Sequence, residues 1–161
     1  MHHDKATMTA MTIEYARAIS LWKYDGIYSV YDHSGDNLDD FMDGAHFVCI
    51  DTDGKLTGYF CFGKNARIPT VEADVYDEGF LDIGLGLKPD LCGKGNGLLF
   101  FNIGLDFAKK FYGTTHFRLA VAGFNERAVK LYKRAGFYVE REVTHSRSGA
   151  RFLILKCVVP N

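Results

Sequence analysis

Between residues 92 and 97 the sequence places three glycines at alternate positions, in the order Cys92-Gly93-Lys94-Gly95-Asn96-Gly97. Glycine lets the backbone approach a ligand closely, and the amides at a helix start carry the positive end of the helix dipole. An apolar segment with helical periodicity follows directly, so these amides would face a bound anion. The loop therefore predicts a diphosphate site, with Lys94 adding a positive charge at its rim.

Two common nucleotide sites use a similar turn, and their spacings differ from this one. The P-loop requires Ser or Thr after Gly-Lys, whereas Gly95 follows Lys94, so nucleotide hydrolysis is not supported. The dinucleotide fingerprint Gly-x-Gly-x-x-Gly, counted from Gly93, ends on Leu98. Counted from Gly95, it ends on Phe100. A glycine-rich connection that only begins a helix stays open as an alternative.

Strand and helix patterns alternate around this loop. Strands are predicted at residues 46–50, 56–62, 81–87, 116–122, 137–143 and 152–158, with a weak one at 70–76, and helices at 9–22, 36–42, 95–111 and 126–135. Residues 51–54 give a hairpin turn, while Asn125 and Gly136 are typical caps for the last helix. The order of elements predicts an α/β fold in which helices pack on a mixed sheet.

Composition excludes several classes of protein. With 161 residues, 47% of them hydrophobic, the chain fits one domain over residues 1–161, although residues 1–6 are expected to be frayed or foreign to the natural chain. A balance of 19 basic and 20 acidic residues gives no general attraction to nucleic acid or membrane. No apolar stretch suits a membrane span or signal peptide, so a cytoplasmic protein is expected. Four scattered cysteines predict no metal site.

Two linked motifs resemble those of the GNAT family of N-acetyltransferases. The family's acetyl-CoA loop reads Arg or Gln, two residues, Gly, one residue, then Gly or Ala, and residues 92–97 match it at both glycines. Cys92 departs from the pattern because it replaces a long polar side chain. Residues 125–137 match the second motif, Asn-x-x-Ala-x-x-x-Tyr-x-x-x-Gly-Phe, at every named position. The resemblance covers about the last two-thirds of the chain.

The resemblance implies a GNAT-like mixed, mostly antiparallel central sheet with splayed central strands and flanking helices. It also implies acetyl-CoA as co-substrate, with no metal. The implied cofactor-binding residues are Leu85 and Leu87 for the pantetheine, Cys92, Gly93, Lys94, Gly95, Asn96 and Gly97 for the diphosphate, and Asn125. The loss of a long side chain at Cys92 removes one contribution to binding. For Asn125, capping of the last helix is an alternative that needs no ligand.

The resemblance also implies catalytic roles. Tyr132 matches the family's general acid, which protonates the coenzyme A sulfur, and a phenol with a pKa of about 10 keeps its proton at neutral pH. The alternative for Tyr132 is core packing. Asp82 is the candidate base, acting directly or through water, with Asp77, Glu78 and Glu72 as rivals. A solvated or salt-bridged carboxylate is the alternative for Asp82.

Aromatic residues follow the first predicted helix, where the family forms part of its acceptor pocket. Trp22, Tyr24 and Tyr28 are the candidate substrate residues, and with Tyr31 they could instead cap the core. The predicted reaction is direct transfer of acetyl to the primary amine of a small molecule or protein N-terminus. A non-catalytic acyl-CoA-binding module and a dinucleotide-binding oxidoreductase stay open as alternatives. A homodimer is expected at the level of the family only.

Overall fold

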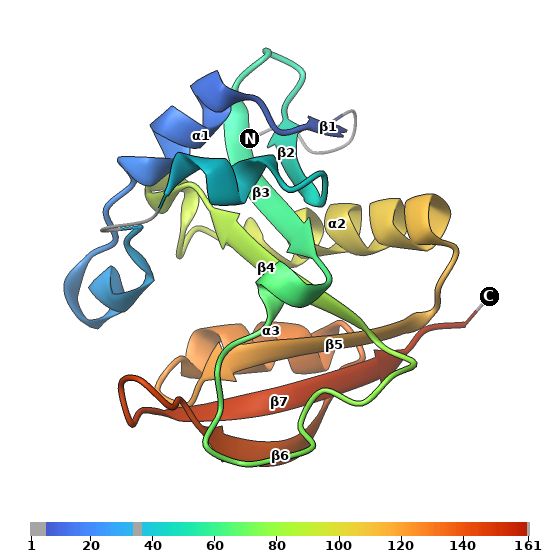
Figure 1. Ribbon diagram of the computed structural model, residues 1–161. Coiled ribbons are helices and arrows are strands. Elements are labelled where there is room, and N and C mark those ends of the chain that lie inside the picture. Colours follow the sequence, from blue (N-terminus) through green and yellow to red (C-terminus); the bar gives the residue numbers. More distant parts are fainter. Residues whose placement is uncertain (1–5, 34–36, 161) are drawn as a thin grey trace. The chain divides into compact units, whose positions relative to one another are not determined.

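The computed structural model of the chain describes residues 6–33 and 37–160, drawn by element in Figure 1. Of residues 1–6, predicted to be frayed or foreign to the natural chain, residues 1–5 lie outside the described part. The chain divides into two compact units. Met1–Cys61 and Leu85–Gly104 make unit 1, and Phe62–Gly84 and Leu105–Asn161 make unit 2. The prediction of one domain over residues 1–161 stays a prediction.

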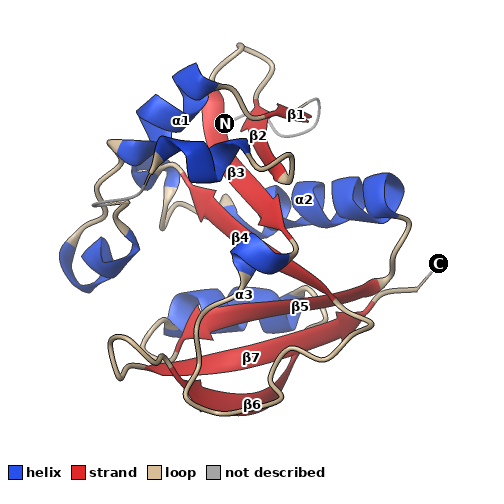
Figure 2. Cartoon of the chain, viewed as in Figure 1, coloured by secondary structure: helices blue, strands red, loops and turns tan. Residues whose placement is uncertain are grey.

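Over residues 6–33 and 37–160 the structure has seven strands and three α-helices, which Figure 2 colours by type. The strands are β1 (Thr7–Ala10), β2 (His46–Ile50), β3 (Leu56–Phe62), β4 (Leu81–Leu87), β5 (His116–Ala122), β6 (Tyr138–Thr144) and β7 (Arg151–Val158), in sheet order β1-β2-β3-β4-β5-β7-β6. The helices are α1 (Ile13–Ser20), α2 (Gly97–Tyr112) and α3 (Glu126–Arg134). Among the described pairings, β4–β5 is parallel, and β1–β2, β2–β3, β5–β7 and β6–β7 are antiparallel. The predicted mixed, mostly antiparallel α/β fold is confirmed, while the splay of the central strands stays a prediction.

In unit 1, α1 is shorter than the predicted helix over residues 9–22. Thr12 caps α1, because its side chain accepts a hydrogen bond from the amide of Tyr15 at 3.2 Å. The residues before this cap pair with β2 as strand β1, from Thr7 opposite Ile50 to Ala10 opposite Phe47. The prediction that residues 9 and 10 are helical is therefore wrong. A cap with extended backbone ends the helix on that side.

Two other sequence predictions also differ from the structure. The helix predicted at residues 36–42 is a 3₁₀ segment, η2 (Leu38–Met42), begun by the side chain of Asn37, and Asp36 lies outside the described residues. The weak strand predicted at residues 70–76 is a single bridge between Thr70 and His145. Side-chain contacts add to this limited backbone pairing, since the carboxylate of Glu72 accepts hydrogen bonds from Thr144 at 2.8 and 3.0 Å. Local propensity cannot distinguish such a segment from a short strand.

Close backbone approach in unit 1 explains a glycine inside α2. A Cβ atom added at Gly104 would lie 2.2 Å from two ring atoms of Phe60. The ring of Phe60 also stacks on Phe100, with centroids 4.7 Å apart, so it has little room to move. The glycine therefore lets α2 lie against β3.

A Gly104→Ala substitution is expected to lower the free energy of unfolding by about 1–2 kcal/mol, because the overpacking of Phe60 outweighs the better helix propensity of alanine. Urea denaturation measures the change, with Asn102→Ala on the exposed side of α2 as the control. If the two variants have equal free energies of unfolding, the ring of Phe60 can move aside without destabilising the fold.

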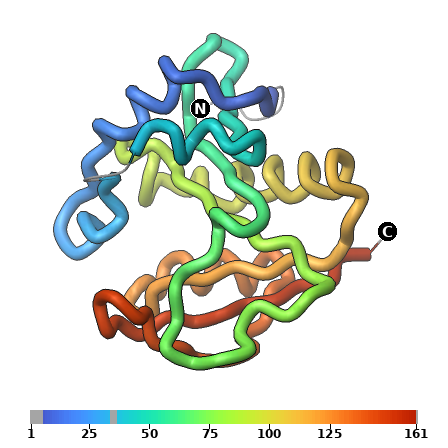
Figure 3. Tube along the Cα trace, viewed as in Figure 1, coloured from blue at the N-terminus to red at the C-terminus, as the bar shows by residue number. Residues whose placement is uncertain are grey.

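In unit 2, β5, β7 and β6 form an antiparallel ladder, in which Phe117 lies opposite Cys157 and Leu119 opposite Leu155. The segment between β3 and β4 belongs to this unit and passes beside the end of β6 (Figure 3), where the amide of Val71 donates to the carbonyl of Thr144. Its Val75 joins Val143 and Ile154 in a buried apolar cluster. This segment thus covers part of one face of the ladder.

Candidate active site

The glycine-rich loop of unit 1 joins β4 to α2. After a short 3₁₀ segment, η4 (Pro89–Leu91), Gly93 and Gly95 have φ angles of 71° and 81°, in the left-handed region that glycine adopts without strain. Asn96 fixes the end of the loop, because its side chain donates to the carbonyl of Leu91 at 3.2 Å. Gly93, Lys94 and Gly95 are exposed. The amides of the first turn of α2, which have no acceptor within the helix, follow directly.

The backbone of β4 presents Leu85 and Leu87 on one edge. The amide of Lys88 donates to the carbonyl of Thr57 in β3 at 2.8 Å. Backbone groups of successive strand residues point to opposite edges, so those of Leu87, and of Leu85 two residues earlier, point away from β3. The hydroxyl of Tyr24 donates to the Leu87 carbonyl on that side at 2.9 Å. The two residues predicted to line the pantetheine therefore share an edge.

Tyr24 and Cys92 meet at the end of β4. The thiol of Cys92 lies 3.6 Å from the carbonyls of both Leu87 and Lys88, in donor geometry. Burial raises the pKa of Tyr24 well above its ordinary value, and the nearby Cys92 and Asp32 raise it further by smaller amounts. Tyr24 thus stays a neutral hydrogen-bond donor. Its place beside the predicted cofactor strand was not visible from the sequence.

The other candidate acceptor residues differ in exposure. Trp22 is only 8% exposed and packs in the core of unit 1 with Ile19 and Phe41. This position agrees with the alternative in which Trp22 covers the core and does not contact a substrate. Tyr28 is half-buried in the 3₁₀ segment η1 (Gly26–Tyr31). An acceptor role therefore stays a prediction for Tyr24 and Tyr28 and has less support for Trp22.

In unit 2, α3 carries the second motif. The side chain of Asn125 accepts a hydrogen bond from the amide of Ala128 at 3.1 Å, and Gly136 beyond the helix has a φ angle of 102°. Both predicted caps are confirmed. Tyr132 is buried, with its ring 6.4 Å from that of Phe137. Its role as general acid and the cofactor contact of Asn125 stay predictions.

Substitutions at Asn125 separate capping from cofactor binding. Asn125→Ala should lower the free energy of unfolding by about 1 kcal/mol, whereas Asn125→Ser keeps a capping oxygen and should lie within about 0.5 kcal/mol of the parent. If the amide also binds acetyl-CoA, Asn125→Ser should weaken binding about fivefold in a calorimetric titration. An unchanged Kd would leave capping as the only role of this side chain.

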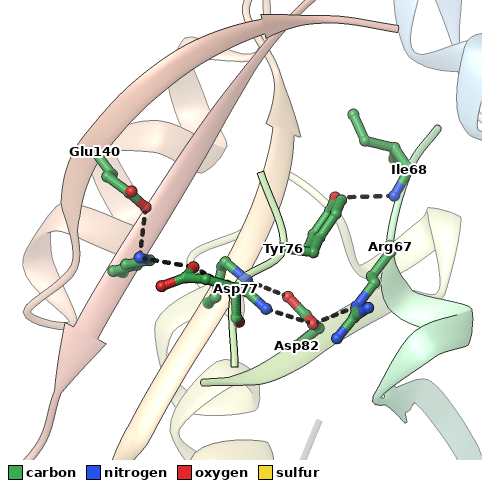
Figure 4. Close-up of polar contacts among 8 residues, drawn as sticks. Arg67, Ile68, Tyr76, Asp77, Asp82 and Glu140 are labelled. Atoms are coloured by element: carbon green, nitrogen blue, oxygen red, sulfur yellow. Dashed lines mark hydrogen bonds and ion pairs between the residues drawn. The ribbon is translucent and has the colours of Figure 1, made fainter. Parts of the chain in front are cut away.

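Asp82 lies in a buried ion-pair cluster of unit 2 (Figure 4). Arg118 donates from Nε to Asp82 Oδ1 at 2.6 Å and from its terminal nitrogen to Oδ2 at 2.9 Å. Arg67 donates to the same Oδ2 at 2.8 Å. Since the Asp82 side chain is 3% exposed, the structure shows the salt-bridged alternative. A base role for Asp82 stays a prediction that this burial does not favour.

The predicted rivals of Asp82 have other surroundings. Asp77 accepts hydrogen bonds from Arg118 at 2.9 Å and from Lys156 at 3.4 Å, and Lys156 also pairs with Glu140 at 2.9 Å. Partial burial acts to raise the pKa of Asp77, but Lys156 and Arg118 outweigh it and hold that pKa below its ordinary value. Glu72 binds Thr144, and its pKa is likewise lowered by those hydrogen bonds.

The lowered pKa of Asp77 predicts a pH dependence. Its ion pairs stabilise the fold fully above the unfolded pKa of about 3.9, and this contribution is lost as the pH falls through the lower folded value. Asp77→Asn should therefore be less stable than the parent at neutral pH, and the difference should shrink below about pH 4. Urea midpoints at neutral and acidic pH give the comparison. A difference that stays constant with pH would contradict it.

Sequence reasoning missed Arg118 and Lys156. Each is a cation with apolar neighbours on both sides within a strand, Arg118 between Phe117 and Leu119 and Lys156 between Leu155 and Cys157, and the two lie opposite each other in the ladder. That pattern is a usable signal, because an isolated charge on a core-facing strand position requires a buried partner. Asp82, opposite Arg118 in the parallel pairing, is that partner.

Over the described ranges 6–33 and 37–160, no group of three or more His, Cys, Asp or Glu side chains is arranged to hold a metal ion. No described helix is long and apolar enough to cross a membrane. The geometry of the loop is compatible with the acetyl-CoA that the resemblance implies, and binding there stays a prediction. Left-handed glycines, exposed loop residues and the first-turn amides of α2 suit a diphosphate, and the edge of β4 at Leu85 and Leu87 suits an extended chain with amide groups.

Comparison with known proteins identifies the family. Residues 13–137, most of the chain, match the family model described as the acetyltransferase (GNAT) family. The chain belongs to this family. The predictions of a GNAT protein and of an acetyl-CoA-dependent N-acetyltransferase are confirmed. None of the curated protein sequences matches the chain.

Solved structures of other GNAT proteins show the same fold. A spermidine N-acetyltransferase SpeG chimera from Vibrio cholerae and hSSAT has a TM-score of 0.73 at 18% identity, over 96% of both chains. A GNAT acetyltransferase from Bacillus anthracis has a TM-score of 0.71 at 14% identity, over 96% of this chain and 95% of that one. AAC(6')-Ib, solved with paromomycin and acetyl-CoA, has a TM-score of 0.71 at 17% identity, over 96% and 94%. At these identities the likeness establishes the fold alone.

Proposed function

We propose that this GNAT acetyltransferase transfers acetyl from acetyl-CoA to a primary amine by direct attack. The geometry of the loop between β4 and α2 carries the proposal, because its left-handed Gly93 and Gly95 and the first amides of α2 suit a diphosphate. The acetyl thioester supplies an activated carbonyl carbon. The edge of β4 that points away from β3 offers the backbone amides of Leu85 and Leu87 to the pantetheine and to the oxyanion.

The acceptor is proposed to be a small-molecule amine, with a protein N-terminus as the other option. Among similar structures, one is titled a spermidine N-acetyltransferase and another holds paromomycin, and both molecules carry primary amines. Tyr24 supports an acceptor position beside the cofactor, because its hydroxyl reaches the end of β4. Its ring and that of Tyr28 would bind an alkyl ammonium group by cation–π attraction.

The proton transfers of the reaction decide which further groups are needed. The amine nitrogen forms a bond to the carbonyl carbon while the carbon–sulfur bond breaks, so the amine must lose a proton and the sulfur must gain one. We propose that Tyr132 donates to the sulfur and regains its proton from water. Water takes the proton of the amine, since the ion pairs of Asp82 leave that carboxylate little access to a substrate.

The test combines binding with turnover. Acetyl-CoA should bind in a calorimetric titration, NAD should not, and coenzyme A release should depend on an added primary amine. Acetyl-CoA binding without turnover over a wide panel of amines would favour the non-catalytic acyl-CoA-binding module. Lack of binding to any coenzyme A species by folded protein would refute both.

A further inference from the structure

Two buried cations in unit 2, Arg118 and Lys156, contact the exposed carboxylate of Asp77, which Figure 4 labels. The side chains of Arg118 and Lys156 are 0% and 8% exposed, whereas that of Asp77 is 60% exposed. Asp77 Oδ1 accepts from a terminal nitrogen of Arg118 at 2.9 Å and from Lys156 Nζ at 3.4 Å. Asp77 comes from the segment between β3 and β4, whereas the two cations lie on β5 and β7.

The charges of the cluster balance only while Asp77 is in place. Three cations face three carboxylates, and they are Arg67, Arg118 and Lys156 with Asp77, Asp82 and Glu140. Asp82 is held by both arginines, and Glu140 by Lys156. Departure of Asp77 would leave one uncompensated positive charge among buried groups, which is costly unless another anion replaces it.

The surroundings of the two cations suit a small planar anion. Lys156 Nζ lies 4.4 Å from the ring centroid of Phe80, and the guanidinium carbon of Arg118 lies 5.0 Å from that of Tyr76. The two rings thus pack against cations that are themselves buried. The backbone carbonyl of Asp77 also accepts from Arg118 at 3.0 Å, so the main chain keeps an anchor when the carboxylate is removed.

We propose that Arg118 and Lys156 form a binding site for the carboxylate of a small molecule, which Asp77 fills in this structure as an internal substitute. The planar guanidinium group of arginine donates hydrogen bonds to a carboxylate in a defined geometry, and the ammonium group of lysine adds a positive charge on a flexible side chain. Because Asp77 is tethered to the site, its effective concentration is about millimolar or higher, and a free carboxylate must compete with it. Removal of the Asp77 carboxylate should therefore expose the site.

Chemical rescue tests the proposal without depending on enzymatic activity. Asp77→Ala in the full chain removes a group of the size of formate and should lower the Tm by about 2–4 °C. Formate, at about 10–100 mM and compared with chloride at equal ionic strength, should restore at least about half of that loss. Glu142→Ala is the matched control, since Glu142 forms an exposed pair with Arg151 and its loss changes the charge equally. Formate should leave the control unchanged.

Three further arms make the result decisive. Formamide, which has the shape of formate without its charge, should not rescue Asp77→Ala, and formate should not rescue the double variant Asp77→Ala/Lys156→Met. Asp77→Ser replaces Asp77→Ala should the latter fail to fold. Stronger rescue by glycine than by acetate would point to an amine acceptor that carries the carboxylate, and the reverse to an effector. Rescue by formamide, rescue of the double variant, or no difference between formate and chloride would overturn the proposal.

Discussion

Tyr132→Phe should lower kcat about 100-fold or more while leaving KM for acetyl-CoA nearly unchanged. A positioned general acid typically contributes a factor of about 10²–10⁴, and the loss is confined to kcat when the group acts only in the transition state. The substitution removes one oxygen and keeps the ring that packs near Phe137. Steady-state coenzyme A release at saturating amine measures both constants.

A matched control separates this chemistry from a general effect of losing a hydroxyl. Tyr138 is 53% exposed at the beginning of β6, so Tyr138→Phe should keep full activity. A more acidic thiol needs less protonation when it leaves the acetyl group. With an acetyl thioester of such a thiol, the difference in kcat between Tyr132→Phe and the parent should therefore be smaller. A Tyr132→Phe enzyme with parental kcat would show that another group protonates the sulfur.

The largest loss of stability is expected for Arg118→Met. This change leaves the carboxylate of Asp82 buried with Arg67 as its remaining partner, and breaking a buried pair from one side costs about 3–5 kcal/mol. The partly exposed Arg67 compensates in part, so a value of about 3 kcal/mol is expected. Urea denaturation with a fitted m-value measures it.

Two comparisons show whether the cost comes from an unpaired charge. The double variant Arg118→Met/Asp82→Asn removes both charges, so it should be more stable than Arg118→Met alone by about 1 kcal/mol or more. Arg151→Met breaks only the exposed pair with Glu142 and should cost about 0–1 kcal/mol. A loss below about 1 kcal/mol for Arg118→Met would mean that this cluster is not electrostatically coupled.

Local pattern was enough to predict most elements of the fold. Local pattern located β2, β3, β4 and β5 with the bounds that the structure has. The turn signal at residues 51–54 separates β2 from β3, and alternation of leucine and isoleucine with Asp82, Gly84 and Gly86 marks β4. Local pattern failed before Thr12, where a short strand precedes the helix. It also failed at residues 70–76, where one bridge and the contacts of Glu72 with Thr144 take the place of a regular strand. In both places the deciding partner lies elsewhere in the chain.

The sequence likewise predicted some features of the candidate site and missed others. The sequence located the glycine-rich loop, and the structure adds the left-handed backbone of Gly93 and Gly95. The confirmed family makes acetyl-CoA the ligand to test there. For Asp82, the observed surroundings differ from those that the prediction of a base requires. Its place on β4 suggested an accessible base, but the structure surrounds it with arginines from β5 and from the segment after β3.

The sequence by itself determined what depends on neighbouring residues: the turn at Gly93 to Gly97, the cap at Asn125, and through these motifs the family. Only the tertiary structure decided which charges are paired and which backbone groups are occupied. Asp82 meets Arg118 across 36 residues, and Tyr24 meets Leu87 across 63. Contacts over such separations follow from how strands pair and pack, so the residue types alone leave several equally acceptable partners.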